Sequence, residues 1–498
     1  MIRWKLLLPL LSMCSYLLPA QTVKSFEGID ASQLGNPRST IDPNGAVGTK
    51  QYMEWVNGYY QAFDKATFAK VWTSPKAISS LAWGANGAHC SGLGVDTVVL
   101  FDRLASRWVI GGHSPSISGH YYSCVAVSNT DDLRASNLTW YTYQFDLTGC
   151  IGTNSSGKLY YPDYTKLSTW LDGYYGSIDL EDPSHGYREI GVVAFVLDRT
   201  NMLTDSTARA MQCFSNVNSN GNVYLAHSLE PADIDGTTAP PQGRDEFFVS
   251  IQNPLNDGQS TTSNSINLWD FHVDWNNPSN STFSQSSLSV PTYTPGCYNV
   301  ANVSYTFCVP EPSFNGSQVH NHIDSVGDRV MWRLAYRNFG SYESFLGSQT
   351  IQVGSGGNTV LKKQTGITWF ELRGGGVPTV FQTGVVDPDQ TLYRFMPSIA
   401  QDRAGNAAVG YSISGGSTHP GIRASWFSLS NPAPTEIAIQ AGKADEKNSQ
   451  GWGDFTSMTV DPVDDCTFWY VNEYFTTAQV SALTWRTRIA NFKVPTCQ

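Results

Sequence analysis

The sequence predicts an all-β protein built as a single β-propeller of six to eight blades, with seven favoured. Of the 498 residues only 15% are charged and 12% are aromatic, and the chain has 44 glycines and 25 prolines. This composition is typical of short strands joined by tight turns. A strand–turn–strand pattern also recurs along the chain, and internal repeats of this kind indicate a propeller. The alternatives are a β-sandwich and a β-helix, which fit the long irregular insertions less well.

Three segments show the repeat most clearly, and they begin at Tyr161, Leu392 and Gly451. Each has a polar or aromatic lead-in, a short apolar strand, a turn rich in Asp or Gly, and a second strand that contains Tyr, which is the signature of a β-hairpin. Seven such units would each hold about 68 residues, enough for a four-stranded blade with loops. The Ser-, Thr- and Asn-rich stretch from Asn256 to Ser289 is predicted to be a long loop. The looser copies of the repeat begin at Thr40, Gly94, Gly243 and His320.

The N-terminus predicts a signal peptide. Arg3 and Lys5 precede a short apolar run that ends at Leu18, and Ala20 closes a small-residue cleavage site. We therefore expect residues 1–20 to be removed and residues 21–498 to form the propeller domain, secreted or otherwise outside the cytoplasm. No later apolar run reaches 18 residues, so no membrane span is expected.

Eight cysteines remain once Cys14 is removed with the signal peptide. An even number of cysteines in an exported chain favours disulfide bonds over a catalytic thiol, and no pair has the C-x-x-C spacing of a metal site. The short loop between Cys297 and Cys308 makes that pair plausible, and a bond between Cys466 and Cys497 would join the last strands. The other four cysteines allow several pairings, and the sequence does not choose among them.

A propeller places one set of residues over the mouth of its central channel. The innermost strand of each blade lines the channel, so the residues just before these strands converge from different blades. Five carboxylates, one imidazole and one guanidinium occupy this position in the seven units. We predict that they ring a single funnel, because a concave pocket of this kind is the usual ligand site. The seven residues are Asp42, Asp96, Asp163, Asp245, His322, Arg394 and Asp454.

Three of the funnel residues are candidates for catalysis, namely Asp163, Asp454 and Arg394. Glycoside hydrolysis requires two carboxyl groups beside the scissile bond, one protonated and one ionised, and Asp454 with Asp163 or Asp96 could form such a pair. A single Asp before a strand more often accepts backbone N–H bonds in a turn. The recurrence of Asp at equivalent positions favours a shared site.

The predicted substrate-binding residues combine charged groups with aromatic rings. Arg394 and Arg337 could each hold a substrate carboxylate with two hydrogen bonds, and the alternative is a salt bridge between blades. The rings of Trp452 and Tyr164 could stack on sugar faces, and the alternative is packing in the core. The full set of predicted substrate-binding residues is Trp452, Tyr164, His322, Asp96, Asp42 and Arg337.

Metal binding has weaker support in the sequence. His320 and His322 form an H-x-H pair, but the spacing supplies no third ligand unless another blade provides His113 or His120. We therefore predict no catalytic metal and no cofactor. Structural calcium stays open where acidic residues cluster, although Asp-Pro turns explain these clusters better. The clusters are Asp387 with Asp389, and Asp461 with Asp464 and Asp465.

Three segments resemble one family of exported bacterial proteins. They are MPSIAQDRAGNAAVGYSISG from Met396, WGDFTSMTVDPVDDCTFWYVNEYF from Trp452, and WRTRIANFKVPTC from Trp485. The family is described as sialidase-like, or BNR-repeat-like, β-propellers, and the resemblance extends over most of the mature chain. It implies a propeller fold, but the family has no established activity and so implies no catalytic residues. The Asp box of sialidases, S-x-D-x-G-x-x-W, is absent from the sequence.

These observations predict a secreted propeller that binds an extracellular glycan at the central funnel. Hydrolysis of that glycan, by a glycoside hydrolase mechanism, follows if two carboxyl groups flank an open cleft. The alternative is a non-catalytic propeller that acts in surface adhesion or as a scaffold. The net charge of −11 argues against nucleic acid and anionic membranes, so we expect a carbohydrate or glycoprotein partner. The sequence leaves the oligomeric state open.

Overall fold

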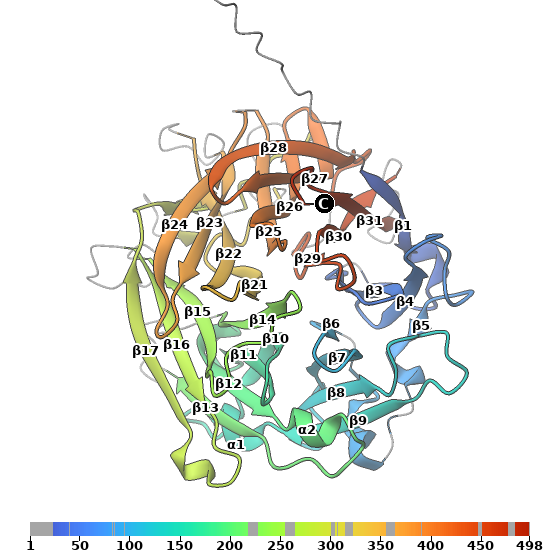
Figure 1. Cartoon of the computed structure of the whole chain (residues 1–498), viewed down its shortest axis with the longest axis vertical. Coiled ribbons are helices and arrows are strands. Elements are labelled where there is room, and N and C mark those ends of the chain that lie inside the picture. The colour runs from blue at the N-terminus through green and yellow to red at the C-terminus, as the bar shows by residue number, and fades with distance from the viewer. Residues whose placement is uncertain are drawn as a thin grey trace, which may run out of the picture.

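The prediction of an all-β propeller is confirmed by the computed structural model. The described residues form seven four-stranded blades around a central axis (Figure 1): five are separate antiparallel sheets, and the other two are joined into one nine-stranded sheet that also includes a short strand. Seven is the number of blades that the repeats favoured. The structure describes residues 23–497 except residues 39, 82, 84, 94, 218–227, 254–263, 300–303, 306, 314–321, 355–363, 390, 447–450 and 477–483. The predicted signal peptide lies outside the described residues.

In blades 1 to 6 the strands follow one another in chain order from the axis outward (Figure 1). The inner strands are largely buried, whereas the outer strands of blades 4 and 6 are largely exposed and are rich in polar residues in blade 4. Blade 1 contains β2 (Asn44–Val47), β3 (Gln51–Val56), β4 (Tyr59–Asp64) and β5 (Lys76–Ala77). Blade 2 contains β6 (Val98–Asp102), β7 (Arg107–His113), β8 (Tyr122–Ser128) and β9 (Trp140–Asp146). Blade 3 contains β10 (Tyr161–Thr169), β11 (Tyr174–Asp182), β12 (Arg188–Leu197) and β13 (Gln212–Val217).

Blades 4 and 5 are joined directly at the axis, because their inner strands pair in parallel with Ala232 opposite Leu334. Arg333 then binds Asp233 and Asp235 of the neighbouring strand at 3.0 Å each, so a buried ion-pair cluster lies at the centre of the ring. Blade 4 contains β14 (Glu230–Asp235), β15 (Glu246–Gln252), β16 (Ser265–His272) and β17 (Thr282–Ser289). Blade 5 contains β21 (Met331–Asn338), β22 (Glu343–Gln352), β23 (Thr365–Arg373) and β24 (Thr379–Val386). Blade 6 contains β25 (Tyr393–Gln401), β26 (Asn406–Gly415), β27 (Thr418–Ser428) and β28 (Asn431–Gln440).

Blade 7 closes the ring with strands from both ends of the described chain. Three of its strands come from the C-terminal part, and the outermost is the first strand of the chain, which pairs antiparallel with the last. Glu27 and Arg488 lie opposite each other in this pair and form an ion pair at 2.6 Å. The strands of blade 7 are β29 (Ser457–Val460), β30 (Thr467–Phe475), β31 (Trp485–Lys493) and β1 (Lys24–Asp30).

The remaining described elements are short. The α-helices among the described residues are single turns, and none is long and apolar enough to cross a membrane. These helices are α1 (Thr148–Ile151) and α2 (Arg199–Met202), with 3₁₀ turns at Ala31–Gln33, Ile78–Ser80, Ala85–Cys90 and Pro278–Asn280. Between blades 4 and 5 lie the two-residue strands β18 (Thr294–Pro295), β19 (Tyr298–Asn299) and β20 (Ser304–Tyr305).

Both disulfide bonds singled out from the sequence are confirmed. Cys297 is bonded to Cys308 in the connection between blades 4 and 5, and Cys466 is bonded to Cys497 in blade 7. The four cysteines whose pairing stayed open form two further bonds. Disulfides in this number are characteristic of proteins that fold in an oxidising compartment. The further bonds are Cys90–Cys124 and Cys150–Cys213.

Blade 4 departs from the sequence prediction in two ways. The unit that begins at Gly243 starts with the second strand of the blade, because the inner strand Glu230–Asp235 is short and three of its six residues are acids. The stretch from Asn256 to Ser289, predicted as a long loop, contains β16 and the exposed outer strand β17. The Ser-rich composition of β17 reflects its position at the solvent-facing edge of the blade.

Candidate functional site

A cavity of about 400 Å³ lies where the inner strands of blades 1, 2, 3 and 7 begin. The loop that precedes the inner strand of blade 5 also contributes to its wall. Nine of its fourteen lining residues are carboxylic acids, and one is a guanidinium, so its character is strongly acidic. The lining residues are Thr40, Asp42, Asp96, Asp163, Tyr164, Asp179, Glu181, Glu189, Asp324, Val326, Asp328, Arg329, Gly451 and Asp454.

A shared backbone feature brings four aspartates to this cavity. The chain passes through the left-handed region two residues before the inner strand at Asp42 (φ 45°), Asp96 (φ 48°) and Phe455 (φ 62°), and inside β10 at Tyr164 (φ 54°), where the pairing of β10 with β11 shifts register. Asp tolerates this conformation better than most residues other than Gly, which explains its use in blades 1 and 2. In blades 3 and 7 the residue with positive φ is aromatic, and the aspartate, Asp163 or Asp454, comes immediately before it. The structure therefore brings Asp42, Asp96, Asp163 and Asp454 together at one cavity, where the sequence placed them.

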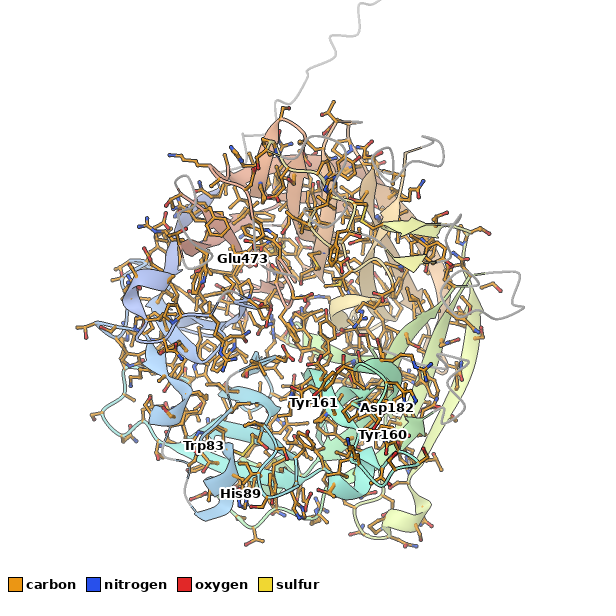
Figure 2. The ribbon with its side chains drawn as sticks, turned by 180° about the vertical axis from the view of Figure 1, so that it is seen from behind. Trp83, His89, Tyr160, Tyr161, Asp182 and Glu473 are labelled. Carbon is orange, nitrogen blue, oxygen red and sulfur yellow. A yellow bond between two sulfur atoms is a disulfide. The ribbon has the colours of Figure 1, made fainter. Side chains whose placement is uncertain are left out.

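Asp454 forms the centre of a polar contact between blades 7 and 3. The hydroxyl of Tyr164 donates to Asp454 Oδ1 at 3.1 Å. The turn that carries Asp454 is held by the backbone N–H of Gly453, which donates to Glu473 at 2.7 Å; Figure 2 labels Glu473 on blade 7. Burial raises the pKa of Asp454, while the charges of Lys166 and Arg329 and the hydroxyl of Tyr164 oppose that rise.

Two cations lie against the ring of Tyr164. Lys166 is fully buried, and its Nζ lies 3.4 Å from the centroid of the Tyr164 ring and 3.8 Å from a carboxylate oxygen of Glu230. The guanidinium carbon of Arg329 lies 4.9 Å from the same centroid. Cations in contact with an aromatic face are attracted to it, so these contacts fix the ring in the cavity wall.

Arg329 is shared among three carboxylates of the wall. Its guanidinium donates to Asp328 at 2.9 Å, to Glu189 at 3.3 Å and to Asp179 at 3.4 Å. Asp179 also accepts from the backbone N–H and the hydroxyl of Ser228, both at 2.7 Å. The Arg329 side chain is therefore a fixed part of the wall, with its donors largely satisfied by the protein.

Asp96, Asp163 and His113 form a compact group beside Asp42. One ligand atom from each of Asp96, Asp163 and His113 lies within 4.8 Å of the other two. Burial and the charge of Asp42 raise the pKa of Asp96 to about 7, and burial and Asp96 raise the pKa of Asp163. Burial lowers the pKa of His113. The group can hold protons at neutral pH or share a bound cation.

Glu181 lies at the outer part of the cavity on β11, opposite Tyr161 of β10, which Figure 2 labels on blade 3. Its nearest charged neighbours are mainly other carboxylates. Burial raises the pKa of Glu181 to about 8, and the charge of Asp163 adds to the rise. Glu181 is consequently protonated at neutral pH and can act as a proton donor.

The two arginines predicted at the funnel lie elsewhere, which corrects their assignment. Arg394 is fully buried within blade 6, where it pairs with Asp389 and with Glu436 at 2.8 Å. Arg337 is buried between blades and binds both carboxylate oxygens of Asp465 at 2.7 and 2.8 Å. Both side chains form salt bridges inside the protein, which was the alternative to substrate binding given for them from the sequence. Neither of them lines the cavity.

Three further predictions about the funnel are also corrected. Trp452 is 1% exposed and packs on Phe475 with ring centroids 5.3 Å apart, so it belongs to the core and offers no face to a sugar. His322 is buried and does not line the cavity, although Asp324 of the same loop does. His320 lies outside the described residues. Asp245 precedes the second strand of blade 4 and pairs with His272 at 2.8 Å, away from the cavity.

The acidic clusters considered for calcium have partners within the protein. Asp464 accepts the backbone N–H groups of Cys466 and Thr467 at 3.0 and 2.9 Å, as expected for a turn residue. Asp461 pairs with Lys65 at 2.7 Å, and Asp465 is bound by Arg337. In the other cluster Asp387 and Asp389 pair with Arg394.

Four residues of the site were not predicted to bind or act on a substrate. They are Arg329, Lys166, Glu181 and His113. Two of them could have been noticed in the sequence. Lys166 is a charged residue inside the inner strand β10, and Arg329 lies at the end of the polar loop that precedes the inner strand β21. Nothing local marks Glu181, which reaches the cavity through the pairing of β11 with β10.

No family model matches the chain, and no curated protein matches it. Solved structures with a similar arrangement of strands include an α-L-arabinofuranosidase from Fusarium graminearum bound to an iminosugar inhibitor, at 7% identity and a TM-score of 0.39, covering 94% of this chain and 98% of that one. An α-L-arabinanase from Penicillium chrysogenum bound to arabinobiose is 10% identical, with the same coverages and a TM-score of 0.37. A neuraminidase-like protein of A/little yellow-shouldered bat/Guatemala is 7% identical, covering 83% of this chain and all of that one, with a TM-score of 0.35.

Proposed function

We propose that the protein is a secreted, glycan-binding propeller that hydrolyses a glycosidic bond in its central cavity. The observation that carries this proposal is that one cavity holds carboxyl groups in contrasting environments. Burial raises the pKa of Asp454, but Lys166, Arg329 and the hydrogen bond from Tyr164 all favour its ionised form and oppose that rise. Glu181 has mainly carboxylate neighbours, and its pKa of about 8 keeps it protonated at neutral pH. Hydrolases of glycosidic bonds require such a division between an acid and a base.

In the proposed reaction Glu181 donates its proton to the glycosidic oxygen as the bond to the anomeric carbon breaks. Asp454 accepts a proton from the water that attacks the same carbon, so each proton is accounted for. Tyr164 holds the carboxylate of Asp454 and offers part of its ring to the sugar. Asp163, the partner of Asp454 predicted from the sequence, lies in the same cavity, and we assign it to the neighbouring cluster of acids.

The charge of the cavity favours a neutral glycan over an anionic one. Nine carboxylic acids line it, and the donors of Arg329 are engaged by three of them. A sialic acid or a uronic acid would bring another negative charge without an arginine to receive it. Hydroxyl groups of a neutral sugar can instead donate hydrogen bonds to the ionised carboxylates. Secretion is supported by the four disulfides.

A glycan array and a reducing-sugar assay on the mature protein test the proposal. We expect binding of neutral glycans and release of reducing ends, with a loss of about 10²-fold or more in kcat for Asp454→Asn and for Glu181→Gln. Asp245→Asn is the matched control, because Asp245 is a partly exposed carboxylate of blade 4 that pairs with His272 and does not line the cavity. It should retain full activity.

The outcomes separate binding from catalysis. Binding without release of reducing ends would contradict hydrolysis and favour the alternative of a non-catalytic adhesion or scaffold propeller. Full activity of Asp454→Asn would remove this carboxylate from the mechanism, and full activity of Glu181→Gln would do the same for the acid. Absence of binding to every glycan on the array would overturn the proposal as a whole.

A further inference from the structure

Four ligand-type side chains from blades 1, 2 and 3 meet at one side of the cavity. Asp96, Asp163 and His113 each place a ligand atom within 4.8 Å of the others. Two donor atoms on opposite sides of one ion, each about 2.0–2.4 Å from it, lie about 4–5 Å apart, so this spacing suits a single ion. The carboxyl group of Asp42 lies beside Asp96 and lines the same cavity, but it is outside the set of three whose ligand atoms lie within 4.8 Å of one another.

Asp42 contributes an independent observation, because one of its oxygens is buried without a partner. Its side chain is 4% exposed and lines the cavity, and Oδ2 accepts a hydrogen bond from Asn57. Among the described residues no N–H or hydroxyl group donates to Oδ1, and the neighbouring Asp96 can hydrogen bond to this carboxyl group only when a proton lies between the two. A buried carboxylate oxygen left in this state is costly, and a bound cation satisfies it.

His113 is oriented as a metal-binding histidine would be. Its side chain is 2% exposed, and Nδ1 lies 2.8 Å from the hydroxyl oxygen of Thr165. With Nδ1–H donated to this oxygen, the other ring nitrogen, Nε2, carries the free lone pair. Metal-bound histidines are usually held in this way, with the second nitrogen bonded to a neighbouring group that fixes the tautomer.

The acids of this group have no lysine or arginine to neutralise them. Among the described residues no lysine or arginine forms an ion pair with Asp42, Asp96 or Asp163. Arg329 is shared by acids on the other side of the cavity, and Lys166 lies against Tyr164 and Glu230. Three carboxylates so close together repel one another unless protons or a cation compensate their charge.

We propose that Asp96, Asp163 and His113 bind one divalent ion of a first-row transition metal, and that the buried carboxylate of Asp42 beside them completes the site. Three carboxylate donors alone would suit calcium or magnesium, but the imidazole shifts the preference toward manganese or zinc. The ion would tie together blades 1, 2 and 3 and offer its open positions to the cavity. The site does not depend on the glycan hydrolysis proposed above, because ion binding is measured in the absence of any glycan.

Titration calorimetry on chelator-treated full-length mature protein tests this site, with Mn²⁺, Zn²⁺ and Ca²⁺ as separate probes. We expect one Mn²⁺ or Zn²⁺ per chain, with affinity at least about 10-fold higher than for Ca²⁺, and a rise in Tm on binding. Pulsed EPR of the Mn²⁺ complex should show coupling to a nitrogen nucleus. His113→Gln should abolish that coupling and weaken binding by about 10²-fold or more.

Two further variants separate ligand loss from misfolding. Thr165→Val removes only the oxygen that orients His113 and should weaken binding by about 10-fold while the protein stays folded. Asp324→Asn removes a carboxylate of the same cavity outside the group and should leave the stoichiometry and affinity unchanged. The absence of binding of all three ions to the wild type would overturn the site. Tighter binding of Ca²⁺, or unaltered Mn²⁺ binding in His113→Gln, would overturn the assignment to a transition metal held by this imidazole.

Discussion

Replacing Arg337 by Met tests whether its guanidinium ties blades together or clamps a ligand. Nη1 and Nη2 donate to the two carboxylate oxygens of Asp465 at 2.7 and 2.8 Å, and Nη2 also donates to the carbonyl of Gln401 at 2.8 Å. The Arg337 side chain is 3% exposed, so the substitution leaves Asp465 charged and largely desolvated. Removing one partner of a buried ion pair costs about 3–5 kcal/mol. Because Arg103 remains 3.8 Å from Asp465, we expect a value near the lower limit, about 3 kcal/mol.

Urea unfolding followed by tryptophan fluorescence measures this loss as a shift of the midpoint. Arg337→Lys keeps the charge but cannot donate to both oxygens in the same plane, so it should lose less stability than Arg337→Met. The double variant Arg337→Met with Asp465→Leu should be more stable than Arg337→Met, since no unpaired charge is left. A loss of less than about 1 kcal/mol in Arg337→Met would refute the structural role, as exposed pairs contribute no more than that. If Arg337→Met instead lost ligand affinity without losing stability, the result would support a role for Arg337 in substrate binding.

Three further predictions concern pH and the turn before β29. Activity on a glycan should fall as pH rises through about 8, because Glu181 then loses the proton that it donates; a pH–rate profile with no alkaline limb would exclude Glu181 as the acid. Burial raises the pKa of Glu54 from 4.5 to about 8, so the folded state holds a proton that the unfolded chain releases between these values, and stability falls as pH rises across this window. Glu54→Gln cannot ionise, so its Tm should exceed that of the wild type at pH 8 and match it near pH 4.5. If the variant and the wild type have the same Tm at pH 8 as well, the burial argument is contradicted. Gly453→Ala should lower the free energy of unfolding by about 1–3 kcal/mol and also lower activity, because Gly453 has φ 83° and a Cβ there would lie 2.8 Å from the hydroxyl of Ser412. Urea unfolding and the reducing-sugar assay measure the two effects. Wild-type values in both assays would show that the turn tolerates a side chain.

The part of the site that could be predicted depends on local sequence. Asp42, Asp96 and Asp454 lie just before an inner strand and Asp163 lies near the start of one, and the propeller geometry alone brings these positions together. The fold class followed from the same local signals, since hairpins with Asp and Gly turns recur along the chain. The inner strand of blade 4 was not predicted because it is short and rich in acids, two of which, Asp233 and Asp235, bind Arg333.

The errors concern side chains whose environment is set by distant residues. Arg394 was expected at the funnel, but its partner Glu436 lies on the outer strand of the same blade, and no local pattern announces that contact. Trp452 precedes Asp454 by two residues, yet it points into the core against Phe475. Arg329 reaches the cavity only because acids of blade 3 lie across from its loop. Burial and pairing of this kind depend on contacts between distant residues, so they can be identified only from the three-dimensional structure.

The closure of the ring by β1 has a consequence for how the protein is made. Ser25 and Arg488 are hydrogen bonded although they are 463 residues apart in the sequence, and they leave the ribosome at opposite ends of synthesis. The first strand must therefore remain unpaired until the last one has emerged, and contacts of such long sequence separation form slowly. An unpaired strand edge is prone to associate with other chains during that interval. A tag or truncation near Lys24 should accordingly reduce the yield of folded protein more than the same change in an exposed loop.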